Sequence, residues 1–269
     1  MLREIDLSEI SDGKLYTAND MVRIECQECK GCSACCHDMG ESIILDPYDL
    51  YQLEKGLHTS FAELMQGKIE LHVVDGIIQP NLKMQEGTLQ CGFLNSEGRC
   101  SIHELRPGFC RLFPLGRIYE DGDFKYFWQI HECAYPNRSK VKIKKWLGIP
   151  ELSVYENYIR IWHNFLKEVQ EIITHTENEE IVRNLNMLVL NEFYVNQYEM
   201  GAASFYEQFE SRISAVSEKI RMYGEESVNK MNNLSIEMQD FMQNDILLLR
   251  VHYLLTKRAF WLIITMYRQ

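Results

Sequence analysis

The chain has 269 residues, of which 46% are hydrophobic, and its formal net charge is −11 at neutral pH. This hydrophobic content is typical of a folded protein and argues against intrinsic disorder. The negative charge argues against sequence-independent nucleic-acid binding, because such binding depends on an excess of Lys and Arg that neutralises phosphates. We therefore expect a folded protein that does not bind nucleic acid.

Cysteines are the most informative residues, and all nine lie in the first half of the chain. The first group comprises Cys26, Cys29, Cys32, Cys35 and Cys36. Thiols this crowded usually share a metal, and a two-residue gap lets a tight loop direct two sulfur atoms at one centre. Because neighbouring side chains diverge, the adjacent Cys35 and Cys36 indicate either a multi-iron cluster or two separate centres.

A disulfide framework is the competing explanation for so many cysteines. An odd number of thiols and an adjacent pair fit that explanation poorly. The first ten residues carry acids where a signal peptide has a basic flank and an apolar run. We therefore expect a cytoplasmic protein, in a compartment that keeps thiols reduced.

Short helices and hairpins are predicted around the cysteine groups. Asp46 followed by Pro47 predicts an N-capped helix that ends near residue 56. Asp-Gly pairs within 71–80 and 116–129 predict two β-hairpins, because Asp and Gly tolerate the positive φ angles of a tight turn. The first half is therefore expected to be short helices and hairpins.

The second cysteine group begins at Cys91 and extends to Cys133. Its Cys-x-Phe-Leu segment, its Arg-Pro-x-x-Cys-Arg-x-Phe-Pro segment around Cys110, and the upstream C-x-x-C-x-x-C-C are in the order of a known family signature. The chain here resembles the YkgJ-like cysteine-cluster family of bacteria and archaea, described as zinc- or iron-chelating. The resemblance covers roughly the first half of the chain and implies eight metal ligands. These are Cys29, Cys32, Cys35, Cys36, Cys91, Cys100, Cys110 and Cys133.

Other residues near the cysteines have less direct roles. Arg106 and Arg111 bracket Cys110, and their guanidinium groups can offset thiolate charge and donate hydrogen bonds to sulfur. Cys26 precedes the signature, so it is either a buried structural thiol or a ligand in a shifted register. His103 stands where the family more often has Tyr, and a place at a helix start is favoured over metal ligation.

The second half of the chain has helical periodicity. Apolar residues recur at three- and four-residue steps and predict antiparallel helices joined by short polar breaks, such as that at 224–227. The final apolar stretch, 259–267, is well short of the roughly 20 residues of a membrane span, so a buried terminal helix is expected. The predicted helices cover 154–172, 179–198, 202–222 and 235–267.

The expected fold class is α+β and mainly helical overall. It comprises a cysteine-rich metal- or cluster-binding domain over 1–145, followed by an all-α helical bundle over 146–269. A protein substrate or partner is expected to dock, if anywhere, on the helical half.

Metal or cluster binding is the expected function, and the number of thiols favours an iron–sulfur cluster, of the 4Fe–4S type, over zinc. The cysteine region also resembles that of flagellin lysine-N-methylases, which implies an alternative, S-adenosylmethionine-dependent protein lysine N-methyltransferase. Neither a glycine-rich strand–turn–helix nor a C-x-x-x-C-x-x-C loop accompanies that resemblance. A structural-zinc scaffold and a redox sensor at Cys35 and Cys36 are further hypotheses.

Overall fold

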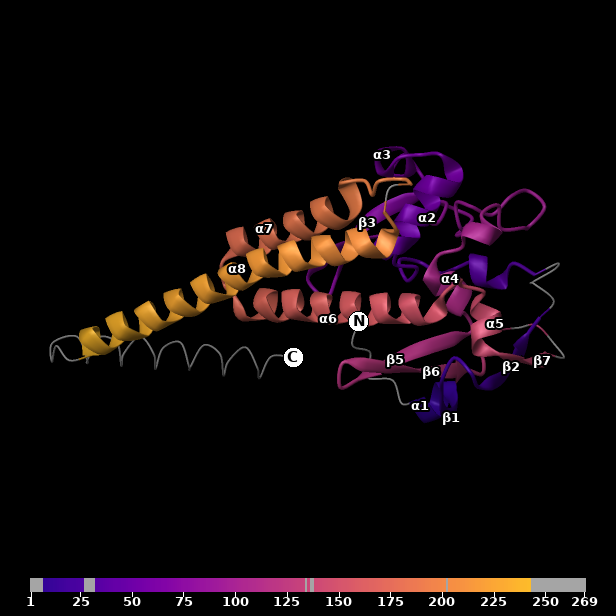
Figure 1. The fold of residues 1–269 in the computed structure, drawn as a ribbon, viewed down its shortest axis with the longest axis horizontal. Coiled ribbons are helices and arrows are strands. Elements are labelled where there is room, and N and C mark those ends of the chain that lie inside the picture. The colour runs from indigo at the N-terminus through magenta and orange to yellow at the C-terminus, as the bar shows by residue number, and fades with distance from the viewer. Residues whose placement is uncertain (1–6, 27–31, 134, 136–137, 202, 243–269) are drawn as a thin grey trace. The chain divides into compact units, whose positions relative to one another are not determined.

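Short antiparallel strands form three small sheets in the computed structural model, which describes residues 7–26, 32–133, 135, 138–201 and 203–242 (Figure 1). The described residues up to Glu218 form one compact unit, and the described residues beyond it belong to a second. The three-stranded sheet has the order β1-β6-β5, while β2 pairs with β7 and β3 pairs with β4. The strands are β1 (Ser11–Tyr16), β2 (Met21–Glu25), β3 (Ile69–Val74), β4 (Ile77–Leu82), β5 (Leu115–Glu120), β6 (Asp123–Gln129) and β7 (Ser139–Lys142).

Both predicted hairpins are confirmed. In the β3–β4 turn Asp75 has φ 52° and Gly76 has φ 86°. In the β5–β6 turn Asp121 has φ 51° and Gly122 has φ 76°. Positive φ at both central residues is what a tight hairpin turn requires, and it explains why the Asp-Gly pairs predicted these turns.

Short helical segments connect the strands, and α2 begins where the sequence predicts. The Asp46 side chain accepts a hydrogen bond from the Asp49 backbone N–H at 2.9 Å, and the Asp49 side chain accepts one from the Asp46 N–H at 3.2 Å. This reciprocal capping satisfies two backbone donors at the start of the helix. The short segments are α1 (Leu7–Ile10), the 3₁₀ turn η2 (Ala34–Cys36), α2 (Pro47–Leu57), α3 (Phe61–Leu64), the 3₁₀ turn η3 (His103–Leu105), α4 (Gly108–Leu112) and α5 (Ile143–Leu147).

The longer helices follow in the second half of the chain. They are α6 (Leu152–His175), α7 (Glu179–Leu190) with a π-helical turn η4 (Asn191–Val195), and α8 (Phe205–Met242). The predicted break at 224–227 is wrong, because α8 continues through it. One glycine costs a helix only about 1 kcal/mol, and Glu and Ser are compatible with helix. Most of the predicted last helix, 235–267, lies outside the described residues.

The expectation of a mainly helical α+β fold with an all-α bundle is wrong. The structure is mixed, with three small antiparallel sheets in the first half of the chain, and α6 packs on strand β4 as well as on helix α7. The Tyr126 hydroxyl of β6 donates to Glu156 of α6 at 2.8 Å. From the other side, Phe209 of α8 lies with its ring centroid 4.7 Å from that of Tyr158.

Apolar periodicity identifies the buried face of a helix but not the element that covers it, and this is why the bundle was predicted. In Figure 1, α6 runs between α7 and the β5–β6 hairpin. The Tyr194 hydroxyl in η4 donates to the backbone carbonyl of Leu45, just before α2. The helices therefore complete the core of the strand-containing half. The domain boundary between residues 145 and 146 stays a prediction.

Asn186 is a buried polar residue that joins α7 to the β3–β4 hairpin. Its Oδ1 accepts a hydrogen bond from the Ile78 N–H at 2.6 Å, and its Nδ2 donates to the Gly76 carbonyl at 3.1 Å. The residue is only 5% exposed. Both backbone groups lie at the hairpin turn, so one amide side chain satisfies a donor and an acceptor that the turn leaves unpaired.

Replacing Asn186 with alanine should lower the free energy of unfolding by about 2–3 kcal/mol, because it leaves buried backbone groups without partners. Chemical denaturation measures the change. Met187→Ala is the matched control: Met187 is the next residue of α7 and is 45% exposed, so its truncation should have little effect. Equal stabilities for the two variants would contradict the role assigned to Asn186.

No helix within the described part of the chain is long and apolar enough to cross a membrane. The apolar stretch at 259–267 lies outside that part.

Candidate metal centre

Most of the predicted cysteine ligands face a common space. A cavity of about 60 Å³, here called the larger thiol cavity, is also bordered by apolar residues such as Ile43 and Leu82. Six of the predicted ligands line it, and they come from three separate segments of the chain. They are Cys32, Cys35, Cys36, Cys91, Cys100 and Cys110.

Backbone hydrogen bonds hold the first two cysteine segments together. The Cys91 N–H donates to the Cys36 carbonyl at 2.8 Å, and His37 forms an isolated β-bridge with Gln90. The η2 turn places Cys35 and Cys36 at this junction. The two cysteine groups, distant in sequence, therefore meet through direct backbone pairing.

The third segment enters through a turn and a short helix. Asn95 Oδ1 accepts from the Arg99 N–H at 2.8 Å, which shapes the turn before Cys100. Cys110 lies in α4, and the Gly108 N–H at the start of α4 donates to Asp49 Oδ1 at 2.7 Å. The buried carboxyl of α2 thus fixes the helix that carries Cys110.

A smaller thiol cavity, of about 30 Å³, adjoins the first. Cys26 and Cys133 line only this one, whereas Cys32, Cys35 and Cys110 line both. Cys26 is 2% exposed, in keeping with a buried thiol, yet it lies beside predicted ligands. Cys29 lies outside the described residues. The assignment of the eight cysteines as ligands stays a prediction.

The surroundings raise the pKa of most of these thiols. Burial is the main cause for Cys91, Cys100 and Cys133, and it raises the pKa of Cys110 well above its usual value. Cys35 differs, because a hydrogen bond with the Cys36 thiol lowers its pKa to about 7, and the charge of Arg106 acts in the same direction. Most of the thiols thus carry protons at neutral pH, and a metal has to displace these protons.

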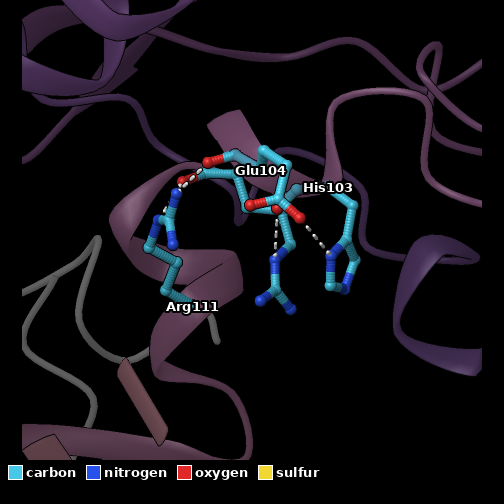
Figure 2. Close-up of polar contacts among 4 residues, drawn as sticks. His103, Glu104 and Arg111 are labelled. Carbon is cyan, nitrogen blue, oxygen red and sulfur yellow. Dashed lines mark hydrogen bonds and ion pairs between the residues drawn. The ribbon is translucent and has the colours of Figure 1, made fainter. Parts of the chain in front are cut away.

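The two predicted supporting arginines occupy different places. Arg106 lines both thiol cavities, where its charge opposes the effect of burial on the pKa of Cys100. Arg111 lines neither thiol cavity. Its guanidinium donates to the backbone carbonyl oxygens of Arg106, at 2.9 Å, and of Glu104 (Figure 2). Arg106 is therefore placed to act on the thiols directly, and Arg111 holds the turn before α4.

Comparison with known proteins adds one match to this geometry. Residues 28–134 match the family model CxxCxxCC, described as "Putative zinc- or iron-chelating domain". This matched segment is here called the CxxCxxCC domain. The resemblance to a zinc- or iron-chelating cysteine family is thus confirmed at that level, and the narrower YkgJ-like assignment stays a prediction. Searches among curated proteins and solved structures gave no significant match.

The donor set of the CxxCxxCC domain fits the metals in that description. Thiolates are soft ligands that select zinc and iron–sulfur clusters over hard cations such as magnesium. All eight predicted ligands fall within the matched segment, and Cys26 precedes it. Among the described residues, no three Cys, His, Asp or Glu side chains are arranged to hold one metal ion. The fit of this site to zinc or iron therefore rests on the chemistry of the thiols and on their common location.

Two residues beside the CxxCxxCC site have roles that the sequence did not reveal. His103 begins η3, as expected, and it also lines the larger thiol cavity. Asp49 falls within the helix predicted after Asp46, but the residue is only 4% exposed and its carboxyl binds α4. Its capping contact with Asp46 joins residues three positions apart, whereas its contact with Gly108 is a tertiary contact without a local signal.

Asp49→Asn should make folding stability less sensitive to pH. Burial, and then the nearby Asp46, raise the pKa of Asp49 well above that of an exposed Asp. Asp49 therefore binds its proton more tightly in the folded state than in the unfolded chain. Its contribution to folding stability is complete below the pKa that Asp49 has in the unfolded chain, and it is lost as pH rises through the higher pKa of the folded state. The asparagine variant has no such proton to lose, so its stability relative to the natural protein should rise with pH.

Denaturant unfolding between about pH 5 and pH 8 measures the difference in unfolding free energy between the variant and the natural protein. The pH effects of other titratable groups largely cancel in this difference. A difference that stays constant over the range would contradict a raised Asp49 pKa.

Proposed function

We propose that the CxxCxxCC domain holds an iron–sulfur cluster, of the 4Fe–4S type, in the larger thiol cavity. The observation that carries this proposal is the number of thiols: six cysteines border one cavity. A structural zinc ion takes four ligands, so two or more of these thiols would be surplus. A 4Fe–4S cluster also takes four cysteines, but each binds a different iron atom, so the ligands are spread over a larger centre.

The chain's own residues would prepare and balance such a centre. Burial keeps Cys91, Cys100 and Cys110 protonated, so these thiols do not carry uncompensated charge before loading. Arg106 supplies a positive charge beside the thiols and offsets the negative charge that four thiolates bring. A bound cluster would supply one-electron transfer or an iron site for a ligand.

Zinc is the main competing occupant, and the family description includes it. In that case the metal would mainly organise a part of the chain with little regular structure of its own, and the role would be that of a scaffold. S-adenosylmethionine-dependent lysine methylation and a protein partner on the helical half stay predictions, to be tested after the metal is known.

The deciding experiment is a visible absorption spectrum of full-length protein purified without oxygen or chelator, before and after dithionite. We expect a brown protein whose broad band bleaches on reduction, with iron and acid-labile sulfide in similar amounts. A colourless, folded protein that contains zinc would overturn the cluster proposal and favour the scaffold.

A further inference from the structure

A third cavity adjoins the thiol cavities and differs from them in size and polarity. It has a volume of about 310 Å³, against about 60 and 30 Å³ for the thiol cavities. This is at the lower end of the range for small-molecule sites. Its wall includes Arg106, Arg111, Tyr48 and Gln52, and we call it the arginine cavity. Arg106 lines all three cavities, so the polar space reaches the wall of the thiol site.

Both guanidinium groups are held by backbone carbonyl oxygens. Arg106 Nε donates to the His103 carbonyl at 2.9 Å. Arg111 uses Nε and one terminal nitrogen on the carbonyl oxygens of Arg106 and Glu104 (Figure 2). Within the described chain, the two terminal nitrogens of Arg106 and the other terminal nitrogen of Arg111 have no hydrogen-bond partner. These fixed groups thus keep donors for a carboxylate or phosphate oxyanion.

The charge balance of the arginine cavity favours an anion. Arg106 and Arg111 both line the cavity, so their positive charges repel each other there. Asp49 also lines the cavity, but its Oδ1 already accepts a hydrogen bond from the Gly108 N–H at 2.7 Å, so its charge is partly compensated within the protein. The Glu104 side chain is 98% exposed to solvent and so compensates the arginines weakly. An oxyanion between the arginines would remove the repulsion.

We propose that the arginine cavity binds a small molecule through its carboxylate or phosphate group, held by Arg106 and Arg111. The binding site itself does not depend on a metal. A role for its ligand as a substrate beside the metal centre rests on the proposed function. Among the described residues, Arg106 alone lines both the arginine cavity and the thiol cavities.

Isothermal titration of the full chain with inorganic phosphate, and separately with succinate, tests the site. At least one probe should bind, and the comparison identifies which anionic group is preferred. Arg111→Gln should weaken binding about tenfold or more, because it removes a charged donor. Arg23→Gln is the charge-matched control: Arg23 is exposed in β2 and lines none of the three cavities, so binding should not change.

A second variant covers the case in which Arg111→Gln does not fold. Gln52→Glu adds a carboxylate to the cavity wall without altering either arginine, and it should also weaken binding. Failure of both probes to bind at millimolar concentration would overturn the proposal. So would binding that neither variant changes.

Metal content is measured on the same samples, so the two proposals fail separately. A metal-free protein that still binds the probe would contradict only the proposed metal centre. A metal-loaded protein that does not bind the probe would contradict only the proposed anion site in the arginine cavity. Gln52→Glu should keep its metal, since Gln52 lines neither thiol cavity.

Discussion

Replacing Cys110 with serine should remove most of the bound metal, with a loss of affinity of more than about 100-fold. Cys110 borders both thiol cavities, so its loss affects a centre in either one. Serine preserves the size of the side chain but offers a hard oxygen that iron and zinc bind poorly in place of thiolate. Elemental analysis and acid-labile sulfide of anaerobically purified protein measure the effect.

Two further serine variants locate the centre. Cys36 borders only the larger thiol cavity, and Cys26 only the smaller one. If the larger cavity holds the metal, Cys36→Ser should lose it and Cys26→Ser should keep it. The reverse pattern would move the centre to the smaller cavity, and full retention of metal by Cys110→Ser would refute the ligand assignment. Near-ultraviolet circular dichroism checks that each variant is folded.

Features with a local cause could be predicted from the sequence. The capping box at Asp46 and the hairpin turns at Asp75 and Asp121 depend on residues within a few positions of one another. The grouping of thiols was also predictable, because the cysteine spacing matches a family signature. These signals need no knowledge of what packs against them.

Features with a tertiary cause could not be predicted. The apolar face of α6 is evident in the sequence, but its division between a sheet and other helices depends on contacts such as that between Tyr126 and Glu156. Likewise Arg106 and Arg111 both flank Cys110, yet only Arg106 lines the thiol cavities. Their positions on either side of Cys110 in the sequence do not determine which cavity each guanidinium group faces. The arginine cavity, formed by α2, the 104–111 segment, residues 148–150 and the start of α6, has no local signature.

Metal removal should destabilise the cysteine-bearing segments far more than the sheets. Around Cys36, Cys91 and Cys100 the chain has isolated β-bridges and short turns in place of extended ladders. Metal–thiolate bonds would link these segments, so the free energy of metal binding becomes free energy of folding. Each kcal/mol of unfolding free energy is equivalent to roughly 2–4 °C in Tm for a protein of this size. Losing several kcal/mol of metal-binding free energy should therefore lower Tm by more than about 10 °C.

Hydrogen exchange after anaerobic chelation, with reductant present, shows where the loss occurs. The Cys91 amide, bonded to the Cys36 carbonyl, should lose protection, whereas paired amides of β5 and β6 should keep most of theirs. The β5–β6 pairing is continuous from Leu115 to Glu120 and packs on α6, so its stability has a source apart from the metal. Unchanged protection at Cys91 would mean that the backbone junction forms without metal. The thiols would then be held in place by the fold, and the metal would bind a site already formed.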